Sequence, residues 1–349
     1  MGGNLMLRAC LFVIAAALTY AHPAPAAQPA PETIAPGLHA IDIPSWFKET
    51  FLDFREDIRE AARVQKRFMV YFGQDGCPYC RELMRVNFSQ KDIVDKTRRH
   101  FDAIALNIWG DREVTWTDGK VRSEKEFAAF LKVQFTPTLL FFDEKGKVVL
   151  RLNGYYPPHK FRAALDYVSG KNENKISFAD YLQQHAGESA SGKLHDQPFF
   201  LKPPFNLDRS RKPAAKPLAV LFEQQHCAAC DEMHARGFKD KATLALAGKF
   251  DVVRLELFGK QPLVAPDGKS QTEEQWARRL KVAYTPTIVF FDTRGKEVFR
   301  IEAYLKLFHF ASSFDYVASG AYRTQPSFQR FIQERAEKIR ERGGQIEIW

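Results

Sequence analysis

The chain has 349 residues, of which 45% are hydrophobic and 27% are charged, and its formal net charge at pH 7 is +9. This composition is typical of a soluble globular protein, and the length exceeds one compact core but suits two domains of ordinary size. Basic and acidic residues are interleaved, so the sequence lacks the basic stripe of a nucleic-acid-binding protein, and we expect no nucleic-acid partner.

The first 27 residues have the pattern of a secretory signal peptide. Arg8 precedes an apolar stretch over 9–18, and small residues follow between Ala21 and Ala27. The stretch is too short to span a bilayer comfortably, although an uncleaved anchor is the alternative interpretation. We therefore expect export to the periplasm with cleavage of the signal, followed by an extended Pro- and Ala-rich lead over 28–44.

The cysteines then fall into pairs. Of the five in the chain, Cys10 lies in the signal segment, and the other four form two Cys-x-x-Cys motifs, Cys77/Cys80 and Cys227/Cys230. In an oxidising compartment an unpaired thiol is a liability, and cleavage of the signal leaves none.

The sequence repeats itself with a period of about 150 residues. TPTLLFFDEKGKVVLR at 136–151 and TPTIVFFDTRGKEVFR at 285–300 are identical at ten of sixteen positions. Such a long period indicates a duplicated domain rather than a short-period solenoid. We predict a first domain at 45–185, a linker at 186–215 and a second domain at 216–349 that ends in a helix.

Each repeat has the same expected order of elements, because apolar runs alternate with turn and capping signals. The first repeat should contain, in order, a strand at 67–72, a helix opened by the Cys-x-x-Cys motif, a helix with a capping box at Ser89 and Asp92, a strand at 101–108, a hairpin at Asp118-Gly119, a helix from Ser123 to about Lys132, two strands around Lys145-Gly146, and a helix at 158–168. The second repeat has counterparts of these signals, and each repeat carries a further helical piece, at 177–184 and 327–342.

A Cys-x-x-Cys motif between a strand and a helix suits thiol–disulfide exchange. The spacing brings both sulfurs to the first helical turn, where free N–H groups and the helix dipole stabilise a thiolate on the first cysteine. The second cysteine lies deeper and resolves the mixed disulfide. Cys77 and Cys227 are thus the predicted nucleophiles, Cys80 and Cys230 the resolving thiols, and we expect neither a cofactor nor a metal.

Other interpretations of these motifs remain open. Two such pairs can form a four-sulfur zinc site, although 146 residues separate them here, and each pair can instead be a static structural disulfide. The second motif also lies in a set of soft and borderline ligands that suit Cu(I). That set comprises His226, Cys227, Cys230, Met233 and His234. The alternative is that the two histidines lie on the surface and that the methionine packs on the same helix.

A second motif follows each cysteine pair, with Thr136-Pro137 at 56 residues beyond Cys80 and Thr285-Pro286 at 55 beyond Cys230. With the FFD-x-x-GK segment after it, this combination resembles the thioredoxin superfamily. The Gly154-Tyr-Tyr-Pro-Pro run and the closing Asp-Tyr-Val are most similar to periplasmic SoxW-type proteins. The resemblance implies two tandem α/β thioredoxin folds, each a mixed sheet flanked by helices. It also implies cis peptides before both prolines, with Thr136, Pro137, Thr285 and Pro286 binding a substrate chain.

The sequence also departs from that family. Cytoplasmic thioredoxins have a buried aspartate six residues before the first cysteine, and here Tyr71 and Leu221 occupy those positions. Asp75 and Glu223 are nearby carboxylates that we expect on other faces or closer to the surface.

These features together predict a periplasmic protein-disulfide reductase. It would act on exported protein thiols or disulfides and be kept reduced by a membrane thiol electron donor. An oxidase or isomerase direction, a Cu(I)-delivery protein and a binding module with structural disulfides are the alternatives.

Overall fold

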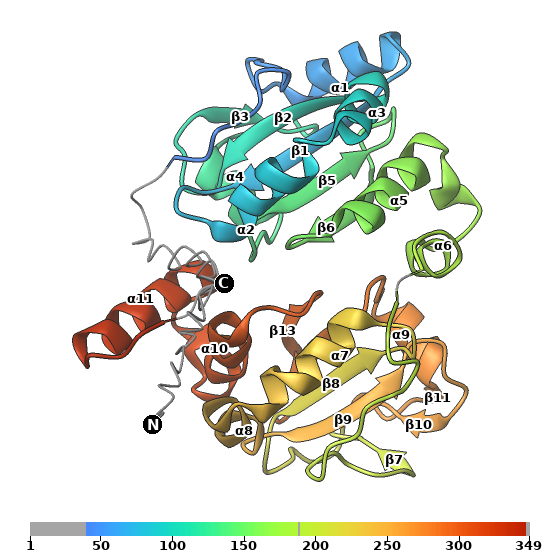
Figure 1. Ribbon diagram of the computed structural model, residues 1–349, viewed down its shortest axis with the longest axis vertical. Coiled ribbons are helices and arrows are strands. Elements are labelled where there is room, and N and C mark those ends of the chain that lie inside the picture. Colours follow the sequence, from blue (N-terminus) through green and yellow to red (C-terminus); the bar gives the residue numbers. More distant parts are fainter. Residues whose placement is uncertain (1–39, 188, 347–349) are drawn as a thin grey trace, which may run out of the picture. The chain divides into compact units, whose positions relative to one another are not determined.

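The structure, a computed structural model, describes residues 40–187 and 189–346. The predicted signal peptide and most of the extended lead lie outside the described residues. Each repeat forms a four-stranded mixed sheet flanked by helices (Figure 1). The α/β fold with two thioredoxin-like regions is therefore confirmed. Within the described ranges, no helix has both the length and the apolar character needed to cross a membrane.

The first repeat is built on a sheet with the strand order β2-β1-β5-β6, in which β1 and β2 are parallel and the other pairs antiparallel. The π-helical turn Leu83–Asn87 continues α2 without a break. The elements are α1 (Phe54–Arg63), β1 (Arg67–Gly73), α2 (Pro78–Glu82), α3 (Lys91–His100), β2 (Phe101–Asn107), β3 (Glu113–Thr115), β4 (Val121–Ser123), α4 (Glu124–Phe130), β5 (Thr138–Phe142), β6 (Val148–Asn153), α5 (Pro158–Ser169) and α6 (Phe178–His185).

The central strand β1 divides the core of this repeat into two layers. All seven of its residues are buried, as expected for a strand covered on both faces. Because alternate side chains point to opposite faces, Met69 and Tyr71 pack with α2, α3 and α5. Val70 and Phe72 pack with α1 and α4 on the other face. The Cys-x-x-Cys motif lies where β1 ends and α2 begins.

The second repeat has the corresponding sheet, in the order β13-β12-β8-β9. Its elements are β7 (Phe205–Asn206), β8 (Leu218–Glu223), α7 (Ala228–Ala235), α8 (Lys241–Ala247), β9 (Asp251–Glu256), β10 (Pro262–Val264), β11 (Ser270–Thr272), α9 (Glu273–Arg279), β12 (Thr287–Phe291), β13 (Glu297–Ile301), α10 (Leu307–Ala318) and α11 (Phe328–Glu341).

The segment predicted as a linker is largely part of the second repeat. Ser191 donates its backbone N–H to Asp231, and β7 pairs with β10. Phe205 and Leu207 are buried in the layer that also contains Trp276 of α9. In the first repeat α1 covers the corresponding face of the sheet. The second repeat has no helix before β8 among its described elements, and this extended segment covers its sheet instead.

The capping signals gave one correct and one wrong prediction. Ser123 forms the expected capping box with Glu126 at the start of α4. The box predicted at Ser89 is wrong, because α3 begins with Gln90 as its N-cap and without a side-chain cap bond. Ser89 belongs to the turn that leaves the π-helical segment, and its hydroxyl donates to the carbonyl oxygen of Val86.

The two repeats contact each other through equivalent residues. The Asn153 side-chain amide donates to the Glu302 carboxylate, 149 positions further on. A Cβ placed on Gly154 would lie 3.9 Å from the Cβ of Ala303, which is its counterpart at the same offset. Contacts between equivalent positions are typical of an interface with two-fold symmetry.

Candidate active sites

The first cysteine pair lies at a sharp change of backbone direction. Gly76 has a φ of +69°, and Cys77 caps α2 with an extended backbone. Pro78 suits the first helical position, since its missing N–H would have no intrahelical partner there. The Cys80 backbone N–H donates to Cys77 Sγ over 3.0 Å, and the two cysteines form a disulfide with a Cα–Cα distance of 5.2 Å. In the reduced state this N–H would stabilise a thiolate on Cys77.

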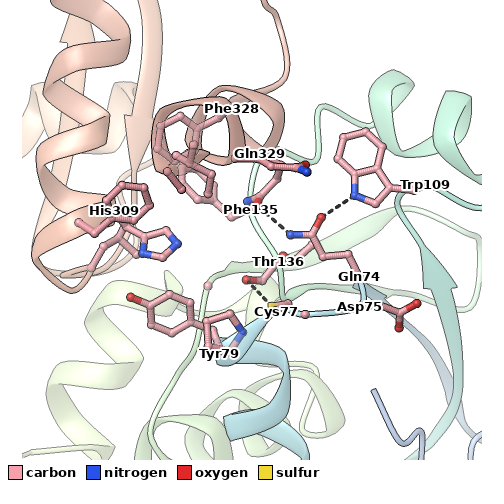
Figure 2. A pocket seen from close by; sticks show the side chains of 18 of the residues that line it. Gln74, Asp75, Cys77, Tyr79, Trp109, Phe135, Thr136, His309, Phe328 and Gln329 are labelled. Carbon is pink, nitrogen blue, oxygen red and sulfur yellow. Dashed lines mark hydrogen bonds between the residues drawn. The ribbon is translucent and has the colours of Figure 1, made fainter. Parts of the chain in front are cut away.

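The loop with the second motif lies against the same sulfur. Cys77 Sγ is 3.4 Å from the carbonyl oxygen of Thr136 (Figure 2). The Thr136–Pro137 peptide bond is cis. Residues 59 positions apart in the sequence thus meet at the sulfur. The loop then continues into β5, next to the central strand.

The second pair repeats this arrangement with a different backbone. Cys227 caps α7, the Cys230 N–H donates to Cys227 Sγ over 3.1 Å, and these two cysteines also form a disulfide. The Thr285–Pro286 peptide bond is cis. His226 stands at the position of Gly76 and has no positive φ. Because the disulfides lie within the repeats, the four sulfurs do not form one zinc site.

The polar groups at the end of the strand before each cysteine pair differ between the repeats. In the first, a Cβ on Gly73 would lie 2.1 Å from the Tyr71 hydroxyl oxygen, so this hydroxyl occupies the space next to Gly73. Burial raises the Tyr71 pKa, and the charge of Asp75 adds to the effect. In the second repeat the equivalents are Leu221 and Glu223, and Glu223 is fully buried. The prediction that Glu223 lies closer to the surface is therefore wrong.

Glu223 has a buried partner on the helix that begins at the second cysteine pair. His234 Nε2 lies 2.9 Å from Glu223 Oε1, and the Gln197 side-chain amide lies 3.0 Å from His234 Nδ1. With the amide donating to Nδ1, the ring proton is on Nε2 and faces Glu223. The ring of His195, which pairs with Asp231, stacks on His234 at 4.7 Å between centroids.

This network corrects the interpretation of His234 as a surface residue. Its exposed fraction is 4%, while Met233 is packed in the core as expected. Both nitrogens of the His234 ring have partners other than sulfur. In the described part of the chain, no group of three or more His, Cys, Asp or Glu side chains is arranged to hold a metal ion. His234 is therefore paired with Gln197 and Glu223 rather than with the cysteine sulfurs. The sequence signal that was missed is the spacing, because His234 lies one helical turn after Cys230.

The first cysteine of each pair is nearly buried, and the residue before each Thr-Pro motif packs against the other repeat. Cys77 and Cys227 have exposed fractions of only 2% and 1%. Phe135, just before Thr136, packs against Phe299 and Phe328 with ring centroids 5.6 Å away. Its counterpart Tyr284 packs against the first repeat in the same manner.

Tyr284 makes both ring and hydroxyl contacts there. Its ring centroid lies 4.4 Å from that of Tyr156, and Lys160 Nζ lies 3.3 Å from its hydroxyl oxygen. Each motif loop that the resemblance assigns to substrate binding therefore has an aromatic side chain inserted into the partner repeat.

A cavity of about 380 Å³ lies beside the first active site, with Cys77 in its wall (Figure 2). The first repeat contributes Gln74, Tyr79 and Trp109, and the second contributes residues of α10 and α11. The Tyr79 hydroxyl accepts the backbone N–H of Lys306 over 3.0 Å, and burial raises the Tyr79 pKa. Burial also lowers the pKa of His309, which faces the Tyr79 ring, to about 4, so this imidazole is neutral at pH 7.

Sequence reasoning did not find these wall residues. Trp109 and His309 belong to no local motif, and α11 was predicted only as a charged terminal helix. Their shared position depends on the packing of the two repeats, which carries no local sequence signal.

The architecture and the two cysteine sites agree with the family comparison. The sequence model of the thioredoxin-like domain family matches residues 54–169 and 208–318, more than half of the chain. The chain belongs to this family. In each matched region a disulfide-bonded Cys-x-x-Cys pair stands at a helix start, which is an arrangement for thiol–disulfide exchange.

The chain is also similar to solved thioredoxin-fold structures. A thioredoxin-fold protein from Helicobacter pylori is 26% identical, with 38% of this chain and 90% of that chain covered and a TM-score of 0.29. A putative disulphide-isomerase from Bacteroides thetaiotaomicron is 24% identical over 40% and 97% of the two chains, with a TM-score of 0.29. The oxidised C-terminal domain of DsbD from Neisseria meningitidis is 15% identical over 33% and 90%, with a TM-score of 0.25. No curated protein matches the chain.

Proposed function

We propose that this protein is an exported thiol–disulfide oxidoreductase that reduces disulfides of other exported proteins. The observation that carries the proposal is the bond from the Cys80 N–H to Cys77 Sγ, which Cys230 and Cys227 repeat. A donor at 3.0 Å favours a thiolate on the first sulfur, and the second sulfur is already within bonding reach to resolve a mixed disulfide.

The exchange requires only sulfur chemistry. The Cys77 thiolate attacks one sulfur of a substrate disulfide, that bond breaks, and the departing thiolate takes up a proton. The Cys80 thiolate then attacks Cys77 Sγ and releases the second substrate thiol, so that two electrons pass to the substrate. A dithiol donor must afterwards return two electrons to Cys77 and Cys80.

The compartment, the direction and the donor belong to the proposal as well. The N-terminal pattern supports export to the periplasm, and the resemblance to SoxW-type proteins supports the reducing direction and a membrane thiol donor. The partners would be exported protein disulfides.

The test is dithiothreitol-driven reduction of insulin by the protein without residues 1–27. We expect catalysis that is abolished when all four cysteines of the two motifs are changed to serine. Absence of catalysis in the unmodified protein would instead support a binding module with structural disulfides. A reduction potential near the thioredoxin value of about −270 mV supports a reductase, and one near about −120 mV supports an oxidase.

A further inference from the structure

The cavity beside Cys77 is walled largely by apolar and aromatic side chains. The residues of this kind are Trp109, Phe135, Leu305, Phe308, Phe328 and Ile332. A side chain entering this space next to the reactive sulfur would lose contact with water and gain contacts with these rings. An apolar side chain is stabilised by such a transfer, whereas a charged one is destabilised.

The polar groups of this cavity are nearly all uncharged. Among its described lining residues there is one carboxylate, Asp75, and no lysine or arginine. The Trp109 indole donates to Gln74 over 2.6 Å, and the Gln74 amide donates to Gln329 of α11 over 2.9 Å. His309 Nδ1 is buried and has no hydrogen-bond partner among the described residues, and burial lowers the pKa of this ring so that it is uncharged at pH 7.

The second repeat provides an internal comparison. A cavity of the same volume, about 380 Å³, lies at the equivalent place and is walled by α6 instead of α11. Lys160 stands there in place of His309, and Glu256 and His226 add further titratable groups. Its lining includes Thr285 but, over the described residues, not Cys227. The duplicated fold thus carries one apolar cavity that reaches its nucleophile and one charged cavity that does not.

We propose that the cavity beside Cys77 selects extended cysteine-containing segments whose residues next to the reactive sulfur are apolar and uncharged, and that it rejects glutathione disulfide. This inference rests on the proposed exchange activity. Glutathione disulfide carries several carboxylates, for which the described lining residues offer no lysine or arginine; Arg330 lies behind the wall, over the Trp109 ring. Asp75 adds a repulsive charge. The exchange itself proceeds as described above, with the apolar neighbour of the substrate sulfur held among the rings.

The experiment uses protein that carries Cys227→Ser and Cys230→Ser, so that only the first site reacts. Its reduced form is mixed with matched peptide disulfides whose flanking residues are apolar, acidic or basic, and with glutathione disulfide. Second-order rate constants are obtained by acid quenching and thiol counting. We expect the apolar peptide to react about ten- to a hundred-fold faster than the acidic peptide, the range that burial of one large apolar side chain supplies.

Charge variants of one wall residue test whether the cavity causes the selection. Gln333 lies in the wall on the exposed side of α11, so its replacement should not disturb the core. Gln333→Lys should raise the rate with the acidic peptide, and Gln333→Glu should lower it further. The matched control is Gln184→Lys, which adds the same charge on α6 outside both cavities and should leave the order of the peptides unchanged.

Two negative results are distinguishable. Equal rates with all peptides and with glutathione disulfide would overturn the selectivity while leaving the exchange activity intact. Failure to react with any peptide, together with failure to reduce insulin, would overturn the proposed function itself. Protein carrying Cys77→Ser and Cys80→Ser should show no apolar preference at the second site, and an equal preference there would also contradict the assignment to this cavity.

Discussion

The two repeats place different polar groups at the end of the strand that precedes each cysteine pair. In the first repeat a tyrosine hydroxyl occupies the space next to Gly73, and in the second the buried pair of Glu223 and His234 lies there. The difference between the repeats arises at two strand positions, where Leu221 and Glu223 replace Tyr71 and Gly73. Strand residues two apart share a face, so a shorter side chain at one position makes room for a longer one at the other. A duplicated fold can therefore change its internal chemistry while keeping the central strand.

The two equivalent cavities near the cysteine pairs also differ in their side chains. Equivalent surfaces enclose equal volumes, but the side chains at equivalent positions differ in charge. We therefore expect the two sites to share the exchange reaction and to differ in substrate and in response to pH. The following predictions test that comparison.

The largest effect should come from the cysteines themselves. In protein with only the first site, Cys77→Ser should lower the rate of disulfide reduction by about three orders of magnitude or more, since it removes the nucleophile. Cys80→Ser should leave attack intact and accumulate a mixed disulfide, which non-reducing gels and mass spectrometry detect. The corresponding changes at Cys227 and Cys230 ask whether the second site meets the same partner. If Cys77→Ser captures partners as well as Cys80→Ser does, the assigned roles are reversed or wrong.

Removing Glu223 should be more damaging than removing the hydroxyl of Tyr71. Glu223→Ala leaves the buried Nε2–H of His234 without its hydrogen-bond partner and should lower the free energy of unfolding by about 1–3 kcal/mol. Tyr71→Phe should change it by less than about 1 kcal/mol, because the buried hydroxyl has no hydrogen-bond partner among the described residues. Urea unfolding measures both, with Glu223→Gln as the isosteric control. Equal effects of the two changes would contradict the difference between the sites.

The complementary pair on β1 can be broken and repaired. Gly73→Ala places a Cβ 2.1 Å from the Tyr71 hydroxyl and should lower the free energy of unfolding by about 1–3 kcal/mol. In a Tyr71→Leu background, which copies Leu221, the same change should cost much less. The measurement is a double-mutant cycle by urea unfolding. Additive effects of the two substitutions would mean that the residues do not share this space.

His309 should make folding sensitive to mild acid. Its pKa falls from about 6.5 in the unfolded chain to about 4 in the folded protein, so the unfolded chain binds the proton first on acidification. The stability that depends on a neutral His309 is therefore fully present above pH 6.5 and is lost as the pH falls toward 4. Between pH 7 and pH 5 the wild-type protein should lose about 1–2 kcal/mol more than His309→Gln. Parallel profiles of the two proteins would show that this ring is not desolvated.

Much of the fold was predictable, because its signals are local. The apolar run at 67–72 became β1, and the Asp-Gly turn joined β3 and β4 as expected. The helix start at Ser123 was also correct, since a capping box depends on residues three apart. The box at Ser89 failed although its spacing was right, because α3 starts one residue later than predicted, with Gln90 as its N-cap.

The sequence by itself determined the duplication, the two cysteine pairs and the order of strands and helices from β1 to α6 and from β8 to α11, since each depends on identity, spacing or periodicity along the chain. It did not predict α1 or β7. Only the tertiary structure decided that Glu223 is buried, that His234 is its partner, and that α11 walls a cavity beside Cys77. These features join residues that are far apart in the sequence or belong to different repeats, as Gln74 and Gln329 do. Their energies arise from desolvation and packing, which depend on what surrounds a side chain in space.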